Sequence, residues 1–124
     1  MIHIIDDDTN VREGFSILLK SLGYESRDYE SGELFLSNSR FDSNDIIILD
    51  IHLSGMNGLE LLERLNKQNI HLPVIIVTAY DNQETRLAAK KHGALAYFRK
   101  PVDGEALIDI IKYNTNLNVN HKIN

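Results

Sequence analysis

The most informative stretch of the chain is residues 46–58, which read Ile46-Ile47-Ile48-Leu49-Asp50-Ile51-His52-Leu53-Ser54-Gly55-Met56-Asn57-Gly58. Its first four residues are apolar and rich in β-branched side chains, which is typical of a central parallel strand buried on both faces. Asn57 is followed three residues later by Glu60, and this spacing predicts the start of a helix. Between the strand and the helix stands Asp50, a carboxylate at the point where a buried strand ends.

The alternation of a strand with a helix recurs along the whole chain. Further strands are predicted over residues 2–5, 24–29, 73–78 and 95–98, and a helical pattern with a period of 3.6 follows each of them. Asp81 with Glu84 has the spacing of a helix cap for the fourth helix, and Asp103 is the expected cap of the last. Five strands alternating with five helices predict an α/β fold, a doubly wound (βα)5 sandwich with a five-stranded parallel sheet.

Composition sets limits on the class of protein. The chain has 124 residues, 43% of them hydrophobic and 25% charged, as expected of one soluble globular domain. The absence of cysteine excludes disulfides and thiolate metal sites. A net charge of −5 argues against direct binding of nucleic acid. No apolar run reaches the ~20 residues of a membrane span and no secretory signal is evident, so we expect a cytoplasmic location without membrane contact.

The pattern changes near the end of the chain. Residues 114–124 lose the apolar period, and five of these eleven residues are Asn. We therefore predict a domain over residues 1–113 and a mobile tail over residues 114–124. Such a chain would have no DNA-binding or catalytic output domain of its own, and its output is expected to pass through contacts with another protein.

Polar side chains gather where the predicted strands end. Asp6 and Asp7 follow the first strand and Asp50 the third, while Thr78 follows the fourth and Lys100 the fifth. The carboxyl ends of parallel strands meet at one edge of the sheet, which is where such folds place their sites. Three neighbouring carboxylates repel one another, and a hard divalent cation such as Mg²⁺ (or Mn²⁺) would relieve that repulsion. Acids, cation, ammonium and hydroxyl together suit phosphoryl transfer.

The chain resembles the receiver domains of two-component response regulators. The resemblance rests on four motifs in family order and spacing, and it covers residues 1 to about 113. They are Asp6-Asp7, Leu49-Asp50-Ile51-His52-Leu53-Ser54-Gly55-Met56-Asn57-Gly58, Val77-Thr78-Ala79 and Tyr97-Phe98-Arg99-Lys100-Pro101. It implies the flavodoxin-like strand order 2-1-3-4-5.

The resemblance also implies a phosphoacceptor and a metal site. Asp50 would accept the phosphoryl group from a sensor histidine kinase or a phosphotransfer protein. Asp7 would bind Mg²⁺ directly and Asp6 mainly through water, with Asp50 and the backbone carbonyl of His52 as further ligands. The chain would then be a signalling domain and not an enzyme, with only self-phosphorylation and slow self-dephosphorylation.

Other positions carry roles in reading out the phosphate. Lys100 would pair with Asp50 at rest and with a phosphoryl oxygen afterwards. Thr78 would bind another phosphoryl oxygen, and Tyr97 would be an aromatic switch that turns inward when Thr78 moves. The changed surface would lie on the fourth helix, fifth strand and fifth helix, for a downstream protein of unknown identity or a homodimer.

Six positions shape the pocket or depart from the family pattern. The small side chain of Ala79 would leave room for the phosphoryl group, and Lys100–Pro101 would be a cis peptide that aims the lysine inward. Ser54 stands where the family usually has proline, which we expect to loosen the loop after the acceptor. His52 and Tyr80 line the phosphoryl pocket, and we expect Tyr80 to shield the acyl phosphate from water.

Other interpretations of these residues stay open. Taken alone, three consecutive acids are more often a solvated turn than a site. A degenerate or relay receiver would act as a scaffold or a phosphoryl shuttle. A flavodoxin-like nucleotide-binding protein would need a phosphate-cradling loop after the first strand, where this chain has acids. A metal-dependent phosphatase would need a general base at a strand end, where the chain places neither His nor Glu.

Overall fold

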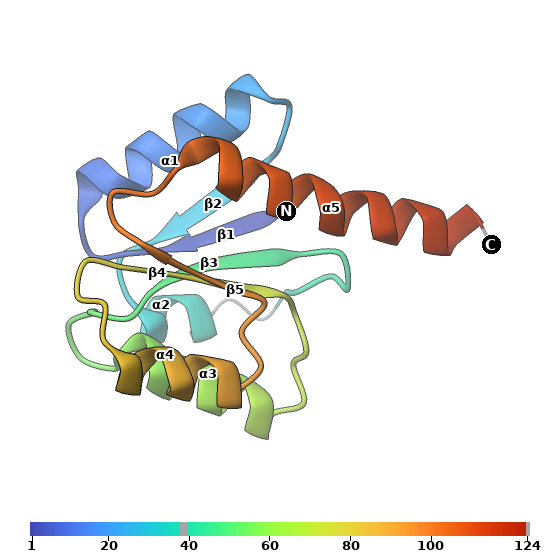
Figure 1. The fold of residues 1–124 in the computed structure, drawn as a ribbon. Helices are drawn as coiled ribbons and strands as arrows, with labels where there is room; N and C mark the ends of the chain where they lie inside the picture. The colour runs from blue at the N-terminus through green and yellow to red at the C-terminus, as the bar shows by residue number, and fades with distance from the viewer. Residues whose placement is uncertain (38–39, 124) are drawn as a thin grey trace.

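The computed structural model describes residues 1–37 and 40–123, with side chains described up to residue 115. Five strands and five helices alternate along this part of the chain (Figure 1). They are β1 (Ile2–Ile5), α1 (Thr9–Ser21), β2 (Ser26–Tyr29), α2 (Gly32–Ser37), β3 (Ile46–Asp50), α3 (Gly58–Lys67), β4 (Val74–Thr78), α4 (Gln83–Lys91), β5 (Ala96–Arg99) and α5 (Gly104–Ile123). The strands are parallel and lie in the order β2-β1-β3-β4-β5, which confirms the predicted fold.

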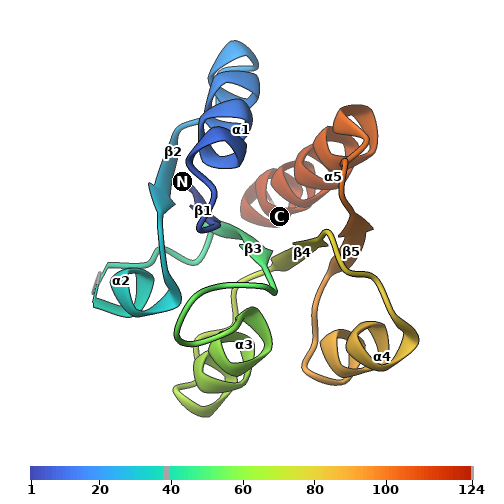
Figure 2. The same cartoon turned by 90° about the vertical axis from the view of Figure 1, so that its left-hand side faces the viewer.

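Helices cover both faces of the sheet. Figures 1 and 2 show α1 and α5 on one face and α2, α3 and α4 on the other. Strand β3 contributes side chains to the hydrophobic core on both faces of the sheet, because successive side chains of a strand point to opposite faces. Ile47 and Leu49 belong to the core on the α2–α4 face, and Ile46 and Ile48 belong to the core beneath α1 and α5. In this central strand the one polar side chain, Asp50, stands at the carboxyl end.

The start of α4 differs from the predicted one by a residue. Asn82, and not Asp81, caps the helix, and its side chain accepts a hydrogen bond from the Thr85 N–H at 2.8 Å. Asp81 instead pairs with the guanidinium of Arg86. Adjacent Asp and Asn residues are both good caps, so spacing alone could not choose between them.

The last helix runs further than the sequence indicates. Helix α5 continues to Ile123, past residue 114, where the apolar period of the sequence is lost. The side chains of Asn114 and Thr115 bond the carbonyls of Ile110 and Ile111, one turn back. Figure 1 shows the end of this helix extending beyond the sheet. The mobility of residues 114–124 stays a prediction. Across the described residues, no helix has the length and apolar content of a membrane span.

Candidate functional site

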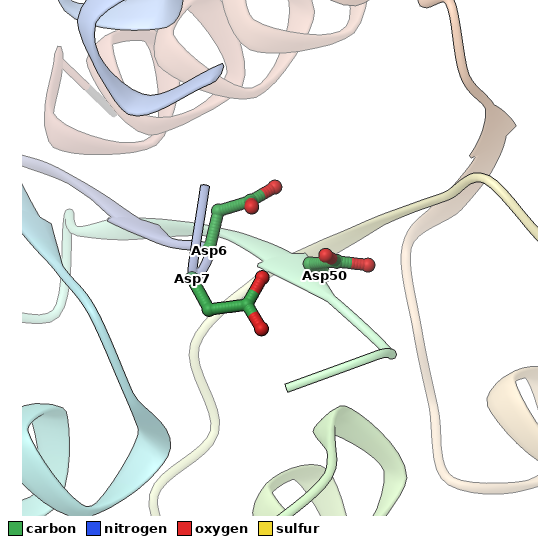
Figure 3. A group of neighbouring side chains, drawn as sticks. All are labelled: Asp6, Asp7 and Asp50. Atoms are coloured by element: carbon green, nitrogen blue, oxygen red, sulfur yellow. The ribbon is translucent and has the colours of Figure 1, made fainter. Parts of the chain in front are cut away.

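The strand ends bring three carboxylates together. Strands β1 and β3 pair with each other, and Ile5 lies opposite Leu49. Asp6 and Asp50 are the next residues along the two strands, so they too are neighbours. Figure 3 shows these side chains and Asp7 at the same edge of the sheet. One oxygen from each of the three carboxylates lies within 4.8 Å of the others. Asp6 and Asp50 are buried while Asp7 is exposed, so two like charges share a poorly hydrated space.

A single ammonium group faces the two buried acids. Lys100 Nζ donates to Asp6 Oδ2 at 2.7 Å and to Asp50 Oδ2 at 3.2 Å. The lysine is therefore shared between the two acids, whereas the sequence led us to expect pairing with Asp50. Burial disfavours the charged lysine, but its hydrogen bond to Asp6 and the charges of both acids outweigh that effect and raise the pKa of Lys100. The Lys100–Pro101 peptide bond is cis.

Asp50 is the acid whose charge is least well compensated. Burial is the main cause that raises the pKa of Asp50, and the charge of Asp6 adds to it. Lys100 and the His52 N–H, which donates to Asp50 Oδ1 at 3.2 Å, act in the opposite direction without cancelling it. One ammonium thus contacts two of the three acids, and carboxylates are the ligands that hard divalent cations prefer. The cluster has the composition and spacing to hold a metal ion.

A glycine allows α3 to begin directly against the end of β3. A Cβ atom at Gly58 would lie 2.4 Å from the Asp50 carbonyl oxygen, a distance that no real side chain could occupy. The Gly58 N–H instead donates to the Ile51 carbonyl at 2.9 Å. Asn57 caps α3 through a bond from the Glu60 N–H, as its sequence spacing predicts. The loop after Asp50 is therefore anchored where it meets the helix.

Glu33 on α2 is a second anchor of that loop, and sequence reasoning missed it. Its Oε2 accepts a hydrogen bond from the Met56 N–H at 3.4 Å. A Cβ atom added to Gly55 would lie only 2.5 Å from the same oxygen, too close for a side chain. Gly55 also has a φ of +76°, which favours glycine. These contacts join segments more than twenty residues apart, so no local pattern could have revealed them. They act on the loop that contains Ser54.

The hydroxyl and the aromatic residues after β4 form the other wall. Thr78 is fully buried, and its Oγ1 accepts a hydrogen bond from the Tyr80 N–H at 3.1 Å. Ala79 is exposed beside it. The Tyr80 side chain is 67% exposed, and its ring meets that of His52 edge to face with centroids 4.7 Å apart. His52 and Tyr80 therefore pair across the two loops that flank the acidic cluster.

Tyr97 on β5 contacts the loop between β4 and α4. Its ring packs against the core on the α2–α4 face, and the Arg86 guanidinium carbon lies 5.4 Å from the ring centroid. Burial and the neighbouring charge of Asp81 raise the pKa of Tyr97. Tyr97, for which the family resemblance implies the role of an aromatic switch, is thus connected to the segment that follows Thr78.

With this geometry in view, comparison with known proteins identifies the family. The model of the response regulator receiver domain matches residues 2–112. The transcriptional regulatory protein FixJ of Azorhizobium caulinodans is 34% identical over 111 residues, which are 90% of this chain and 53% of that protein. The DNA-binding transcriptional regulator NtrC of Klebsiella pneumoniae is 32% identical over 87% of this chain and 23% of its own length. The chain spans about half the length of the first of these regulators.

Solved structures agree with this assignment. The CheY-like receiver domain protein of Methanospirillum hungatei superposes with a TM-score of 0.86 at 30% identity, over 97% of this chain and 96% of that one. The response regulator StyR gives a TM-score of 0.87 at 32% identity, over 98% of this chain and 61% of that one. The acids at the ends of β1 and β3, the lysine after β5 and the match over nearly the whole chain lead to one conclusion: this chain belongs to the response regulator receiver domain family.

Proposed function

We propose that this chain is a phosphorylation-controlled switch whose acceptor is Asp50. The observation that carries the proposal is the setting of this carboxylate, which is buried at the end of β3 and shares one lysine with Asp6. A carboxylate whose charge is poorly compensated is a better nucleophile than one that is fully paired. The donor would be a phosphohistidine on a sensor histidine kinase or a phosphotransfer protein.

The transfer uses groups that already surround Asp50. A carboxylate oxygen of Asp50 attacks the phosphorus, the phosphorus–nitrogen bond breaks, and the imidazole leaves with the bonding electron pair. Charge on the equatorial oxygens must be stabilised during this step. Lys100 is within reach of one of them, because Asp6 holds its ammonium beside Asp50. Thr78 would bind another once its hydroxyl leaves the Tyr80 backbone.

A divalent cation fits the charge of the site. We propose that Asp6, Asp7 and Asp50 hold Mg²⁺ (or Mn²⁺), with the His52 carbonyl as a further ligand. When bound, the ion supplies positive charge that neutralises phosphoryl oxygens. The acidic excess over Lys100 supports this assignment, because three carboxylates and one ammonium leave room for two positive charges.

The output of the switch is a changed surface. When the Thr78 hydroxyl binds phosphate, the Tyr80 N–H loses its acceptor and the segment after β4 shifts. Tyr97 contacts that segment, so α4, β5 and α5 form the proposed output surface for a downstream protein or a second copy of the chain. We further propose that the protein acts in the cytoplasm, as a signalling domain and not as an enzyme of multiple turnover.

Phosphorylation by a small donor tests the proposal. Incubation of the purified chain with Mg²⁺ and acetyl phosphate should add one phosphoryl group per chain, measured by intact mass. Asp50→Asn should abolish the gain, whereas Asp8→Asn, which changes an exposed acid two residues from Asp6, should keep it. The absence of a gain with saturating donor would contradict the proposal and favour a degenerate receiver that acts as a scaffold.

A further inference from the structure

Two buried polar atoms near Tyr97 lack hydrogen-bond partners. Among the described side chains that are not exposed, the Tyr97 hydroxyl and Asp81 Oδ1 are the buried oxygens without a partner of standard geometry. Leaving a buried polar atom unpaired is costly, and native structures rarely do so. One of these two atoms is a donor and the other is an acceptor, so each could satisfy the other.

The surroundings of Asp81 place it against the tyrosine. Its charge and its hydrogen-bonding capacity both act on the Tyr97 hydroxyl and, after burial, are the main causes of the raised pKa of that group. Its second oxygen, Oδ2, accepts a hydrogen bond from Arg86 Nη2. The guanidinium of Arg86 also lies over the Tyr97 ring, 5.4 Å from the centroid. Arg86 therefore contacts both the carboxylate and the ring.

We propose that Asp81 is a positioning residue that accepts the Tyr97 hydroxyl hydrogen bond and, itself paired with Arg86, holds Tyr97 in its half-buried position. Asp81 lies three residues after Thr78, in the segment whose backbone bonds the Thr78 hydroxyl. A shift of that segment therefore moves the acceptor of Tyr97 directly. This last step rests on the proposed function, because it assumes that phosphate binding moves Thr78.

The cap assignment explains why Asp81 is available for this role. An aspartate that capped α4 would use its carboxylate on the helix N–H groups. Asn82 performs that task, with its side chain 2.8 Å from the Thr85 N–H. The carboxylate of Asp81 is thereby left to face Arg86 with one oxygen and Tyr97 with the other.

A titration of Tyr97 tests the contact without any phosphate. Tyrosine ring carbons labelled with ¹³C would be followed by NMR against pH, with the Tyr97 signal assigned from Tyr97→Phe. In Asp81→Asn the Tyr97 pKa should fall, whereas in Arg86→Gln it should rise, because Arg86 lowers it. Glu84→Gln, which removes an exposed acid from the first turn of α4, should leave it unchanged. A Tyr97 pKa that is the same in Asp81→Asn as in the wild type would overturn the proposal.

A second measurement tests the link to the phosphoryl site. The contact is present without phosphate and the shift of the segment would break it, so the contact opposes the bound state. Beryllofluoride, a phosphoryl mimic, should therefore bind about fivefold more tightly to Asp81→Asn and to Tyr97→Phe, a factor that corresponds to the loss of one hydrogen bond. The double variant should bind no more tightly than either single one, because both remove the same contact. Additive gains, or binding no tighter than that of the wild type, would overturn the link. If the wild type binds no beryllofluoride, the proposed function fails, while the titration still decides whether Asp81 holds Tyr97.

Discussion

Two buried aspartates stand at opposite ends of β3 and have opposite surroundings. Asp45 precedes the strand and Asp50 ends it, and they are 3% and 4% exposed. The carboxylate of Asp45 accepts from His3 Nε2 at 2.8 Å and from the Asp42 N–H at 3.1 Å, and the Met1 ammonium lies 3.3 Å away. Asp50 has the His52 N–H and a lysine that it shares with Asp6.

The two pKa values therefore move in opposite directions. Burial works to raise the pKa of Asp45, but the bonds from His3 and Asp42 and the Met1 ammonium together outweigh it and lower the value. Burial and the charge of Asp6 raise the pKa of Asp50. Equal burial thus gives unequal results, because the partners differ. The Asp45 end of the strand is well paired, and we propose that the Asp50 end supplies the reactive carboxylate.

The largest expected effect is at the stable end. Asp45→Asn should lower the free energy of unfolding by about 3 kcal/mol, because it removes one partner of a buried charged network. Chemical denaturation at neutral pH measures this loss, and phosphorylation of the folded variant should continue. A change below about 0.5 kcal/mol, the range of ordinary surface substitutions, would refute the assigned role of Asp45.

The network of Asp45 also predicts a dependence on pH. Since the folded pKa of Asp45 is lowered, its stabilisation is present above the unfolded value of 3.8 and is lost as the pH falls through the folded pKa. The wild type should therefore lose its stability advantage over Asp45→Asn in acid. Denaturation curves of both proteins down to about pH 3 measure this convergence, and a constant difference would argue against it.

At the reactive end, the next effect is on transfer. Lys100→Ala should slow phosphorylation by acetyl phosphate about 100-fold, the usual cost of removing one group that stabilises charge in the transition state. Stopped-flow or quenched mass measurements at fixed Mg²⁺ give the rate. Lys112→Ala on α5 is a matched control with an exposed lysine. Equal rates for Lys100→Ala and the wild type would remove Lys100 from the mechanism.

Removal of the poorly compensated charge of Asp50 should stabilise the fold. Asp50→Asn should raise the free energy of unfolding by about 1 kcal/mol at neutral pH, because an ionised Asp50 is less favourable folded than unfolded. The gain should fade as the pH falls through the raised pKa and the wild-type carboxyl becomes protonated. If the variant is less stable than the wild type at neutral pH, the charge of Asp50 is compensated as fully as that of Asp45, which contradicts the contrast between the two aspartates.

The smallest effect concerns the aromatic pair at the mouth of the site. Tyr80→Ala should speed loss of the phosphoryl group by about threefold, if the ring excludes water as its position against His52 indicates. The decay of phosphorylated protein after removal of the donor measures this rate. Tyr113→Ala, which truncates an exposed tyrosine on α5, is the control. Equal decay rates in Tyr80→Ala and the wild type would exclude shielding.

The gathering of Asp6, Asp50, Thr78 and Lys100 at one edge of the sheet was predictable from sequence, and the network of Asp45 was not. Asp6, Asp50, Thr78 and Lys100 each follow an apolar run, and the geometry of parallel strands brings such positions to one edge. The pairing of His3 with Asp45 joins positions 42 residues apart, and no period or motif marks it.

The remaining differences have similar physical causes. The choice of Asn82 over Asp81 as a cap depends on backbone geometry that two adjacent capping residues leave undecided. The continuation of α5 past residue 113 rests in part on bonds from Asn114 and Thr115 to the helix backbone, which need no apolar period. Local patterns report burial and strand ends, whereas contacts between distant polar groups appear only in the folded chain.

One titration tests the contrast most directly. Side-chain carboxyl carbons of aspartate, labelled with ¹³C, would be followed by NMR against pH with and without Mg²⁺, with assignments from Asp45→Asn and Asp50→Asn. Asp45 should titrate below the ordinary value of 3.8 and Asp50 above it, and Mg²⁺ should lower the pKa of Asp50 while leaving Asp45 unchanged. An Asp50 that titrates at or below 3.8 without Mg²⁺, or that does not respond to Mg²⁺, would contradict the account.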